Sequence, residues 1–566
     1  MHGTALATFA TTTYSENYGK FKSLEELNKL TAATPETARA VKSWLASSGA
    51  TCHEVTGDIL RCKARATDVE KMLGTRVRVH RNGRTGARVA RAVGDAIVPA
   101  HMREHLQVIV GLRELPVPSA ADLKWQHSSL PMAVESSTTL PQGSSLSVIP
   151  ETLTSLYNIA APSKASRTSL GIVEYQSLGA YGANDLSTFE SEMDVNFAVN
   201  KTVGPFDQGS PAAESTLDVQ YGGSLSQGMG APVDITYMTY TGWVYEAASS
   251  WVSGESSLPA VLSNSYGWSE TQQCQISPDA PACSSGSKAF VEAVNTLYQK
   301  LGAAGHTVMF SSGDAGAHGR SDAMCSGDAV HPAYPASSPY VVGVGATQLT
   351  ADAAQGGSAP VCSQVQCASG AAGTTEQVCS TATGALITSG GGFSAYSDAL
   401  DFEKDAIKGY LADASNGPGT GNFNAGGSMY PDVSANGHAY VIKLQGSNQQ
   451  VDGTSASCPV TAAMFSLVNA QRVANNKPVL GFARPWIFQL ASEHPEVFND
   501  MVGGDNNAGE YFTCKTGFKV VKGPDAATGF GTINFDKLLS ADAAMLGYEV
   551  SAADIDAAVK SLRGAQ

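Results

Sequence analysis

Short apolar runs recur along the chain from residue 148 onward, and helical stretches separate them. The runs lie at residues 170–174, 235–240, 260–265, 307–311 and 340–344. Short, continuous apolar runs are typical of parallel strands that are buried on both faces. Their alternation with helices predicts an α/β fold, a doubly wound and mostly parallel sheet with helices on both faces.

Residues 1–115 follow a different pattern, in which helices and strands alternate over shorter distances. Helices are expected at residues 24–30, 34–45 and 67–73, a strand pair at 51–62 around Gly57, and a strand at 75–80. Two of these helices carry start signals, Thr34 with Pro35 and Glu36 in one, and a capping box of Thr67 and Glu70 in the other. The pattern predicts a small α+β domain ahead of the main one.

Residues 116–147 are rich in Pro, Ser and Thr and have no sustained period. Segments of this composition behave as exposed linkers that proteases cut easily. The chain is therefore expected to divide into a small domain at 1–115, a linker at 116–147 and a large domain at 148–566. The last residues, from about 540, are expected to form one or two amphipathic helices.

The charge of the small domain contrasts with that of the whole chain. A stretch from Arg76 to Arg91 contains no acidic residue, whereas the chain carries a net charge of -15 and has a pI of about 5.2. The stretch is interpreted either as a solvated loop or as an acid-sensitive contact with the acidic main domain. Charged residues make up only 15% of the chain, and the scarcity of Lys and Arg gives no support for nucleic-acid binding.

The sequence contains no run of about 18 apolar residues, so no membrane span is expected. Its first residues, MHGTALATFATTTYSENYGK, lack the basic start and apolar centre of a signal peptide. Either the protein is cytosolic or its true N-terminus is missing from this sequence. The ten cysteines favour an oxidising compartment instead.

Some of these cysteines are placed for local disulfides. Cys52 with Cys62, and Cys274 with Cys283, are close enough in sequence to pair. Cys458 is expected to be a buried free thiol. Because no Cys-x-x-Cys pair occurs, the cysteines are not expected to bind a metal.

One serine precedes a long apolar helix. The segment GTSASCP at 453–459 opens the apolar run VTAAMFSLVNA at 460–470. Pro459 suits the first turn of such a helix, which would place Ser455 at a helix N-terminus, where negative charge is favoured. That position suits a serine that attacks a carbonyl and creates an oxyanion. Taken alone, the segment is more typical of a Ser/Thr cap on an ordinary core helix.

Three acidic residues are the candidates to assist such a serine. Glu214 and Asp218 would lie on one face of a helix, where mutual repulsion raises the pKa of at least one carboxyl group. Asp314 follows the expected strand at 307–311, at the end where α/β sheets build their sites. A solvated helix face and a turn-forming aspartate are the ordinary alternatives.

No histidine is a good candidate for the base. His2-Gly3-Thr4 lies outside the main domain with no aspartate before it, although the subtilisin order is Asp, His, Ser. The lipase motif Gly-x-Ser-x-Gly also fails, because Ser457 occupies the position of its last glycine.

Taken together, these residues resemble the sedolisins, the serine-carboxyl peptidases, and lean toward their tripeptidyl-peptidase branch. The segments that carry the resemblance are YGKF at 18–21, LEEL at 24–27, VKSWL at 41–45, IP at 149–150, YN at 157–158, ESTLDVQY at 214–221, SNSYG at 263–267, SSGD at 311–314, HPAYPASSPYV at 331–341, SGGGFS at 389–394 and GTSAS at 453–457. The resemblance covers nearly the whole chain. It implies a subtilisin-like catalytic domain preceded by a propeptide.

The resemblance also implies a role for each candidate residue. Ser455 would be the nucleophile, Glu214 its general base and Asp218 the residue that orients Glu214. Asp314 would line the oxyanion hole, where it must be protonated to donate a hydrogen bond. A carboxylate base works best near its own pKa, so activity in acid is expected.

A metal site and a substrate strand follow from the same resemblance. FNDM at 498–501 and VKGPDAATGFG at 521–531 resemble the family's calcium loop. The implied ligands of one Ca²⁺ are the carboxylates of Asp500 and Asp525 and the carbonyls of Met501, Val521 and Gly523, all hard oxygen donors. Ser265 and Gly267 match the strand along which substrate lies extended.

The leading hypothesis is therefore an acid peptidase made as a zymogen, acting on peptides or proteins and inhibited by its own propeptide. It would work in a lysosome or another acidic compartment, or after secretion. Tripeptide release from free N-termini competes with endoproteolysis. A catalytically silent peptide-binding homologue and a neutral subtilisin-like protease are the remaining alternatives. The acidic set argues against the silent homologue, and the missing Asp and His against the neutral protease.

Overall fold

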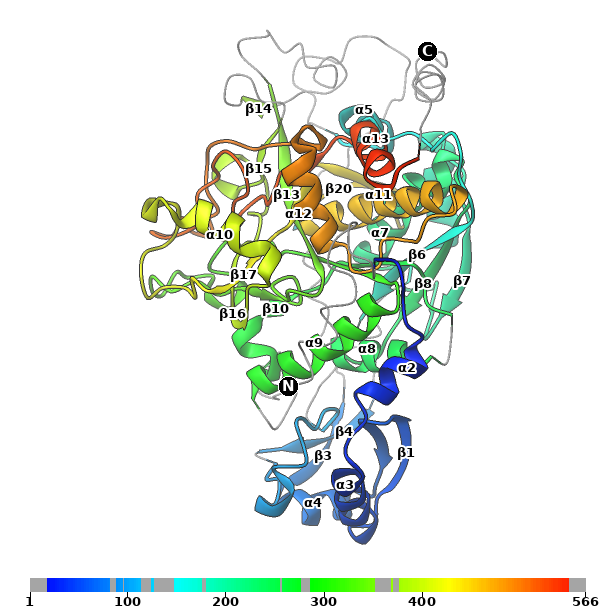
Figure 1. Cartoon of the computed structure of the whole chain (residues 1–566), viewed down its shortest axis with the longest axis vertical. Helices are drawn as coiled ribbons and strands as arrows, with labels where there is room; N and C mark the ends of the chain where they lie inside the picture. The colour runs from blue at the N-terminus through cyan, green and yellow to red at the C-terminus, as the bar shows by residue number, and fades with distance from the viewer. Residues whose placement is uncertain are drawn as a thin grey trace.

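Figure 1 shows a computed structural model of the chain, with a small domain below a larger one. It describes residues 18–81, 88–94, 96–112, 124–126, 147–175, 180–254, 257–275, 286–351, 368–369, 376–509 and 511–548. Among these residues, no helix is long and apolar enough to cross a membrane.

The large domain is built on one 11-stranded sheet. In spatial order its main path is β21 (Phe498–Asn499), β22 (Thr532–Ile533), β18 (Val433–Asn436), β13 (Val342–Ala351), β11 (Thr307–Ser311), β9 (Val261–Asn264), β6 (Thr168–Glu174), β8 (Val233–Thr239) and β7 (Val199–Val203). Every neighbouring pair from β22 to β7 is parallel. The remaining strands β14 (Ala368–Ser369) and β15 (Glu376–Val378) pair with β13. The prediction of a mostly parallel sheet is confirmed.

The strand order reverses between β6 and β9. From β6 the chain adds β8 and β7 on one side, and from β9 it adds β11 and β13 on the other. In doubly wound sheets such a switch point opens a crevice at the carboxyl ends of the strands. Glu174, which ends β6, and Ser265, which follows β9, both lie at this point.

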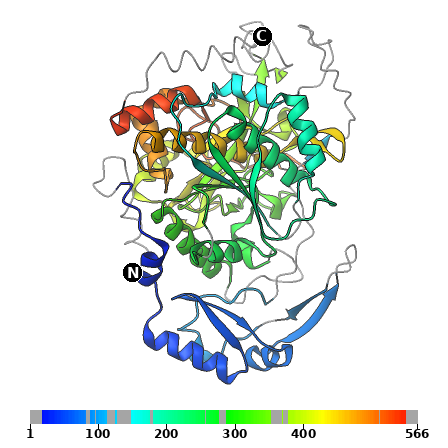
Figure 2. The same cartoon turned by 90° about the vertical axis from the view of Figure 1, so that its right-hand side faces the viewer.

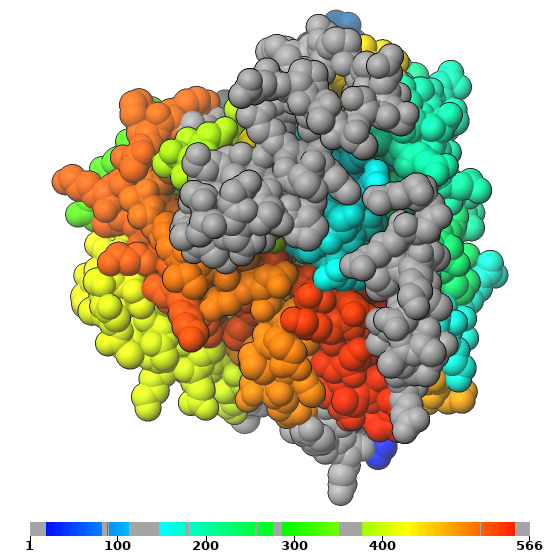
Figure 3. Space-filling model, turned by 90° about the horizontal axis from the view of Figure 1, so that it is seen from above, coloured from blue at the N-terminus to red at the C-terminus, as the bar shows by residue number. Residues whose placement is uncertain are grey.

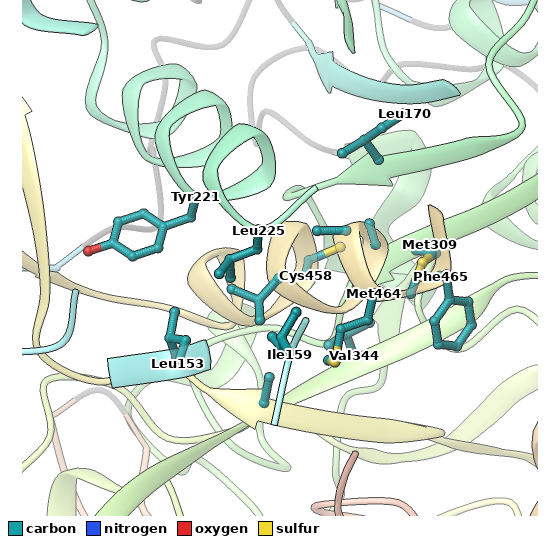
Figure 4. Packing of buried hydrophobic residues seen from close by; sticks show 14 of the residues in the cluster. Leu153, Ile159, Leu170, Tyr221, Leu225, Met309, Val344, Cys458, Met464 and Phe465 are labelled. Atoms are coloured by element: carbon teal, nitrogen blue, oxygen red, sulfur yellow. The ribbon is translucent and has the colours of Figure 1, made fainter. Parts of the chain in front are cut away.

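Helices cover both faces of the sheet, as predicted. One face carries α5 (Pro150–Tyr157), α7 (Ala213–Ser224), α11 (Thr454–Ala474) and α13 (Phe535–Leu546), and the other carries α8 (Val244–Val252) and α9 (Ser287–Ala303). Neighbouring residues of β11 show the alternation, because Met309 packs with the α11 cluster and Phe310 with the α9 cluster. Figure 4 shows Cys458, Met464 and Phe465 of α11 packed among residues of these elements.

Other helices and strands complete the large domain. They are α6 (Ala183–Met193), α10 (Lys404–Leu411), α12 (Arg484–Glu493), β10 (Trp268–Ser269), β12 (Ala333–Tyr334), β16 (Gly392–Asp398), β17 (Gly427–Tyr430), β19 (Tyr440–Leu444) and β20 (Ser447–Asp452). Seen from the end opposite the small domain, α13 lies beside α12 on the surface, as Figure 3 shows. The expected C-terminal helix is α13, and residues 549–566 lie outside the described part.

The small domain matches most of its predicted elements. It contains α2 (Leu24–Leu30), α3 (Pro35–Ser47), β1 (Thr51–Thr56), β2 (Ile59–Lys63), α4 (Ala66–Leu73), β3 (Arg76–Arg81) and β4 (Arg88–Val93). Thr34 caps α3 by accepting from the amide of Thr37, as expected. The capping box at Thr67 is wrong: α4 already begins at Ala66, so Thr67 lies inside it. Glu70 instead accepts from the amide of Val77, which begins the contact to the next strand.

The arginine-rich stretch is mostly a hairpin rather than a loop. β3 and β4 pair antiparallel from Arg76 with Val93 to Arg81 with Arg88, and residues 82–87 lie outside the described part. Alternating Arg and Val side chains fit an exposed two-stranded ribbon, which explains why charge alone misled the loop interpretation. An acid-sensitive contact of this stretch stays a prediction.

The expected linker is only partly described. Its residues Lys124–Gln126 form β5, which pairs antiparallel with β20, although no regular structure was expected there. Pairing with an exposed sheet edge needs only backbone groups, so the composition of the segment carried no signal for it.

The disulfides agree with the sequence where they are described. Cys52 bonds to Cys62, and Cys274 is disulfide-bonded, while its expected partner Cys283 lies outside the described residues. Cys325 bonds to Cys514, 189 residues away, a pairing that the sequence left open. Cys458 is a buried free thiol, as predicted, and so is Cys379.

Candidate active site

Helix α7 carries two of the candidate acids deep in the large domain. All of its residues are buried, including Glu214 and Asp218, which are 2% and 0% exposed. The predicted spacing is confirmed, since the two carboxyl groups lie one turn apart on this helix. Among the residues that the structure describes, none of their four oxygens has a hydrogen-bond partner with good geometry. A buried carboxyl pair of this kind is more stable when it holds a proton.

Burial is the largest cause of the raised pKa of both Glu214 and Asp218. The charge of Asp218 raises the pKa of Glu214 further, and the charge of Glu174 raises the pKa of both. The Ser455 hydroxyl acts in the opposite direction and lowers the pKa of Glu214. Like charges in a medium of low polarity cannot all ionise, so the group retains protons well above the usual carboxyl range.

The third carboxyl group, Glu174, was not found from the sequence. It ends strand β6, is fully buried, and accepts a hydrogen bond from the hydroxyl of Tyr266 at 2.8 Å. Burial raises its pKa to about 7. An acid at the carboxyl end of a buried strand beside the switch point was the signal that could have found it.

Ser455 is the second residue of α11 and is almost completely buried. Its position at the helix N-terminus is confirmed, so free N–H groups and the helix dipole favour negative charge beside it. The Ser455 hydroxyl donates to the carbonyl of Ser265 at 3.4 Å. The Ser455 hydroxyl also lowers the pKa of the Glu214 carboxyl, which places the two side chains near each other.

Pro459 does not lie in the first turn, which is a correction to the sequence prediction. The helix begins at Thr454, so Pro459 is its sixth residue. It has no N–H to donate to the carbonyl four residues earlier, which belongs to Ser455. The Ser265 hydroxyl donates to that carbonyl instead, at 3.2 Å.

Asp314 lies beyond the end of β11 and is tied to the start of α11. Its Oδ1 accepts from the amide and from the hydroxyl of Thr454, each at 2.8 Å. The Thr454 hydroxyl in turn accepts from the amide of Gly313 at 3.1 Å. This small network holds the carboxyl of Asp314 beside the residue that precedes Ser455, and the charge of Asp314 raises the pKa of Glu214.

The fold thus brings together residues from α7, β6, the β11 end and α11. Among the described residues, no histidine ring bonds to Ser455: His438 pairs with Asp452, His318 with Asp322, and His306 with a carbonyl. His2, the weak sequence candidate, lies outside the described residues. The carboxyl group whose pKa the Ser455 hydroxyl lowers is that of Glu214.

The expected metal residues lie in two loops that meet near β21. The Oδ2 of Asp500 accepts from the amide of Gly523 at 2.7 Å, while its Oδ1 is buried and has no hydrogen-bond partner in the described part of the chain. Asp525 accepts from the amides of Ala527 and Thr528. A buried carboxylate oxygen without a donor fits a site that is completed by a cation. Among the described residues no cluster of three or more His, Cys, Asp or Glu side chains could hold a metal, so the remaining ligands would be carbonyls.

The two expected substrate residues follow β9 at the edge of the site. Ser265 is buried against α11, and Gly267 is partly exposed next to β10. A side chain at Gly267 would meet only ordinary contacts, with the Tyr334 carbonyl at 3.6 Å as the nearest. Tyr266 points into the site toward Glu174.

Comparisons with known proteins show which family the chain belongs to. Residues 4–115 match the Pro-kumamolisin activation domain, and residues 231–479 match the subtilase family. Physarolisin of Physarum polycephalum is 36% identical over 539 residues, which cover 93% of this chain and 89% of that protein. The chain belongs to the sedolisin, or serine-carboxyl peptidase, family.

Other members of the family are also similar to it. Tripeptidyl-peptidase 1 of Homo sapiens is 30% identical over 548 residues, covering 93% of this chain and 86% of that protein. The structure of Pseudomonas sedolisin, a serine-carboxyl proteinase complexed with two molecules of pseudo-iodotyrostatin, shares the fold with a TM-score of 0.51 and 23% identity. It covers 70% of this chain and 98% of that one. The present chain is therefore a serine peptidase of this family that carries an N-terminal activation domain.

Proposed function

We propose that the protein is an acid-active peptidase in which Ser455 is the nucleophile and Glu214 its general base. The observation that carries the proposal is the burial of Glu214 and Asp218 beside a serine at a helix N-terminus. A pair that retains a proton above the usual carboxyl range still provides a base when one of its members is ionised. Asp218 holds the shared proton and orients Glu214.

The reaction uses these groups in order. As the Ser455 oxygen attacks the peptide carbonyl carbon, its proton passes to Glu214, and the carbonyl oxygen gains a negative charge. Glu214 then gives the proton to the leaving amine as the carbon–nitrogen bond breaks. A water molecule, deprotonated by the same carboxylate, releases the acyl group from Ser455. Because Glu214 replaces histidine as the base, the rate is expected to peak in acid.

Asp314 serves as the oxyanion donor in this proposal. Its Oδ1 already accepts two hydrogen bonds from Thr454, so the other oxygen carries the proton that is donated to the oxyanion. An ionised Asp314 would repel the developing charge, which adds a second reason for activity in acid.

Substrate is proposed to lie extended along Ser265 and Gly267, where backbone groups beyond β9 can pair with a peptide. The relatives named tripeptidyl-peptidase 1 support release of tripeptides from free N-termini. An endopeptidase of the same family remains the competing activity.

We further propose that residues 1–115 inhibit the enzyme until the linker at 116–147 is cut, leaving 148–566 as the mature peptidase. The match of residues 4–115 to an activation domain supports this division. An acidic compartment such as the lysosome, or an acidic extracellular space, suits the proposed pH dependence.

One Ca²⁺ is proposed to bind the carboxylates of Asp500 and Asp525 and the carbonyls of Met501, Val521 and Gly523. The Oδ1 of Asp500, which is buried and lacks a hydrogen-bond partner among the described residues, supports this site. A bound Ca²⁺ would neutralise the carboxylates and hold the two loops together. It takes no part in the peptide cleavage.

The test is peptide cleavage near pH 4 by processed protein, on a substrate with a free N-terminus and on its blocked twin. Ser455→Ala and Glu214→Gln are each expected to lower kcat by about 10⁴-fold or more, and the double variant by little more than either alone. Tripeptides released only from the free substrate support a tripeptidyl-peptidase, and cleavage of both substrates supports an endopeptidase. Folded, processed protein that cleaves neither would leave the silent peptide-binding homologue.

A further inference from the structure

The N-terminal segment Tyr18–Leu27, which includes the start of α2, precedes the rest of the small domain and lies along the outside of the large domain. Figures 1 and 2 show it in dark blue, passing from α2 along the flank of the large domain. Tyr18, the first described residue of the segment, contacts Arg472 in the C-terminal part of α11. Arg472 follows Ser455 by 17 residues of the same helix, so the contact lies roughly 25 Å from the nucleophile.

Tyr18 contacts a buried polar cluster of the large domain, centred on Arg472 and Asp542. Its hydroxyl accepts from Nη1 of Arg472 at 2.6 Å. The Nε and Nη2 of Arg472 bond to Asp542, which also accepts from Trp486 and Tyr548. Asp542 and Trp486, which both belong to the large domain, hold the guanidinium of Arg472 independently of the segment. Without Tyr18, however, Nη1 of a fully buried arginine loses an acceptor.

The Phe21 ring packs closely against two glycines of the large domain, Gly305 and Gly481. A side chain at Gly305 or at Gly481 would lie 2.9 Å or 2.4 Å from the Phe21 ring. Gly19 fits as closely, since a side chain there would lie 2.3 Å from Pro478. This tight mutual fit is typical of a specific interface rather than of a loosely lying tail.

Hydrogen bonds continue the contact along α9 and α8. The amide of Lys22 donates to the carbonyl of Ala303 at 3.0 Å, and Asn28 donates to the carbonyl of Val252 at 2.7 Å. Leu27 is fully buried against Ala303. The propeptide residues in all of these contacts precede the linker, and their partners follow it. A cut at 116–147 therefore leaves each contact intact.

We propose that the surface formed by Gly305, Arg472, Pro478 and Gly481 is a docking site, separate from the active site, that holds the severed propeptide on the catalytic domain through residues 18–28. The inference rests on the proposed cleavage of the linker. Because this surface is remote from Ser455, substrate does not compete for it. A propeptide held at this surface and also through Asp58 and Lys300 dissociates much more slowly than one held at only one of these places, since the remaining contact keeps the released one at high effective concentration. The partner of this surface is an extended segment with the pattern Tyr-Gly-x-Phe.

The test uses the full chain with Ser455→Ala and a specific protease site placed within residues 127–146. The protein is cut at neutral pH, and propeptide dissociation is followed by size-exclusion chromatography and surface plasmon resonance. Tyr18→Ala and Phe21→Ala are expected to accelerate dissociation by about tenfold or more. Lys20→Ala, in the same segment but exposed, is the matched control and should dissociate like the parent. Equal rates for all four proteins would overturn the proposal.

A second measurement does not depend on how the variants fold. A synthetic peptide of residues 15–31 is added in excess to the cut parent complex, and it is expected to displace the propeptide faster than the same peptide with Tyr18→Ala. No difference between the peptides would also overturn the docking site. The nucleophile is absent throughout, so failure of the proposed peptidase activity cannot imitate either result.

Discussion

Ser265 and Ser455 exchange hydrogen bonds across the active site. The Ser265 hydroxyl donates to the carbonyl of Ser455 at 3.2 Å, and the Ser455 hydroxyl donates to the carbonyl of Ser265 at 3.4 Å. The first bond exists because Pro459 has no N–H for the Ser455 carbonyl. The same Ser265 hydroxyl also lowers the pKa of Asp218. The Ser265 hydroxyl has a single proton, so it donates either to the Ser455 carbonyl or to Asp218. The protonation of the acid pair is therefore coupled to the backbone position of the nucleophile.

Ser265→Ala should therefore lower kcat and change its pH dependence. The Ser455 carbonyl loses its donor, and the pKa of Asp218 rises further because the hydroxyl that lowers it is gone. We expect a loss in kcat of about 10- to 100-fold, with the acidic limb of the profile moved to higher pH. Ser263→Ala, whose hydroxyl donates to Cys458, is the matched control and should keep the parent profile.

Pro459→Ala tests the cause of this arrangement. An alanine there supplies the missing N–H, so the Ser455 carbonyl regains a helical partner. Ser265→Ala should then cost much less in the Pro459→Ala background than in the parent, a coupling that a double-mutant cycle on kcat measures. Additive effects of the two substitutions would contradict the explanation.

Stability should fall as the pH rises from about 4.5 to about 7, partly because of Glu270. Burial raises the pKa of Glu270 to about 7, and the carboxylate accepts from the Ser394 hydroxyl and the Ala395 amide. The native state therefore holds a proton that the unfolded chain releases near pH 4.5. The stabilisation is complete below that pH and is lost as the pH passes about 7, by on the order of 3 kcal/mol at most.

The measurement is the melting temperature of the Ser455→Ala protein between pH 4 and pH 8. Glu270→Gln should flatten the fall, although its own melting temperature is lower because an amide presents donors to donors. Glu292→Gln, an exposed residue of α9, should leave the slope unchanged. A slope in Glu270→Gln equal to that of the parent would remove Glu270 from the explanation.

Removal of Ca²⁺ should destabilise the large domain. A chelator is expected to lower the melting temperature of the parent by roughly 5 °C or more, because ligand binding to the native state alone stabilises it. Asp500→Asn should lower the bound metal content and abolish the response to chelator. Asp401→Asn, an exposed aspartate paired with Lys404, is the control that should respond like the parent. A parent protein without bound metal would refute the site.

Asp58 of the small domain is expected to contribute to propeptide binding through Lys300. The Lys300 side chain is fully buried on α9 and pairs with Asp58 at 3.0 Å. Burial lowers the pKa of Lys300, and the charge of Asp58 opposes that shift. Asp58→Asn leaves the ammonium buried without a counter-charge, so the severed propeptide should dissociate about tenfold faster or more at neutral pH. Glu25→Gln, which breaks an exposed pair with Lys29, should have little effect on the same measured rate.

Local patterns determined much of this protein. The apolar runs identified the central strands, and the Glu214–Asp218 spacing placed both carboxyl groups on one helical face, because each depends on neighbours within a few residues. The pattern of motifs indicated the sedolisin family. Thr34 as a helix cap and the Cys52–Cys62 disulfide were predictable for the same reason, since each partner is close in sequence.

The tertiary structure decided the rest. Glu174 joins the acid cluster because α7, which carries Glu214 and Asp218, packs against β6, and Cys325 meets Cys514 across 189 residues. Ser265 supports Ser455 because α11 begins five residues before Pro459, a boundary that the proline alone suggested elsewhere. Tyr18 contacts Arg472, which lies 454 residues further along the chain, so no local sequence pattern predicts the contact. Short-range preferences set which elements form, whereas packing sets which side chains share a buried site, and the chemistry depends on that sharing.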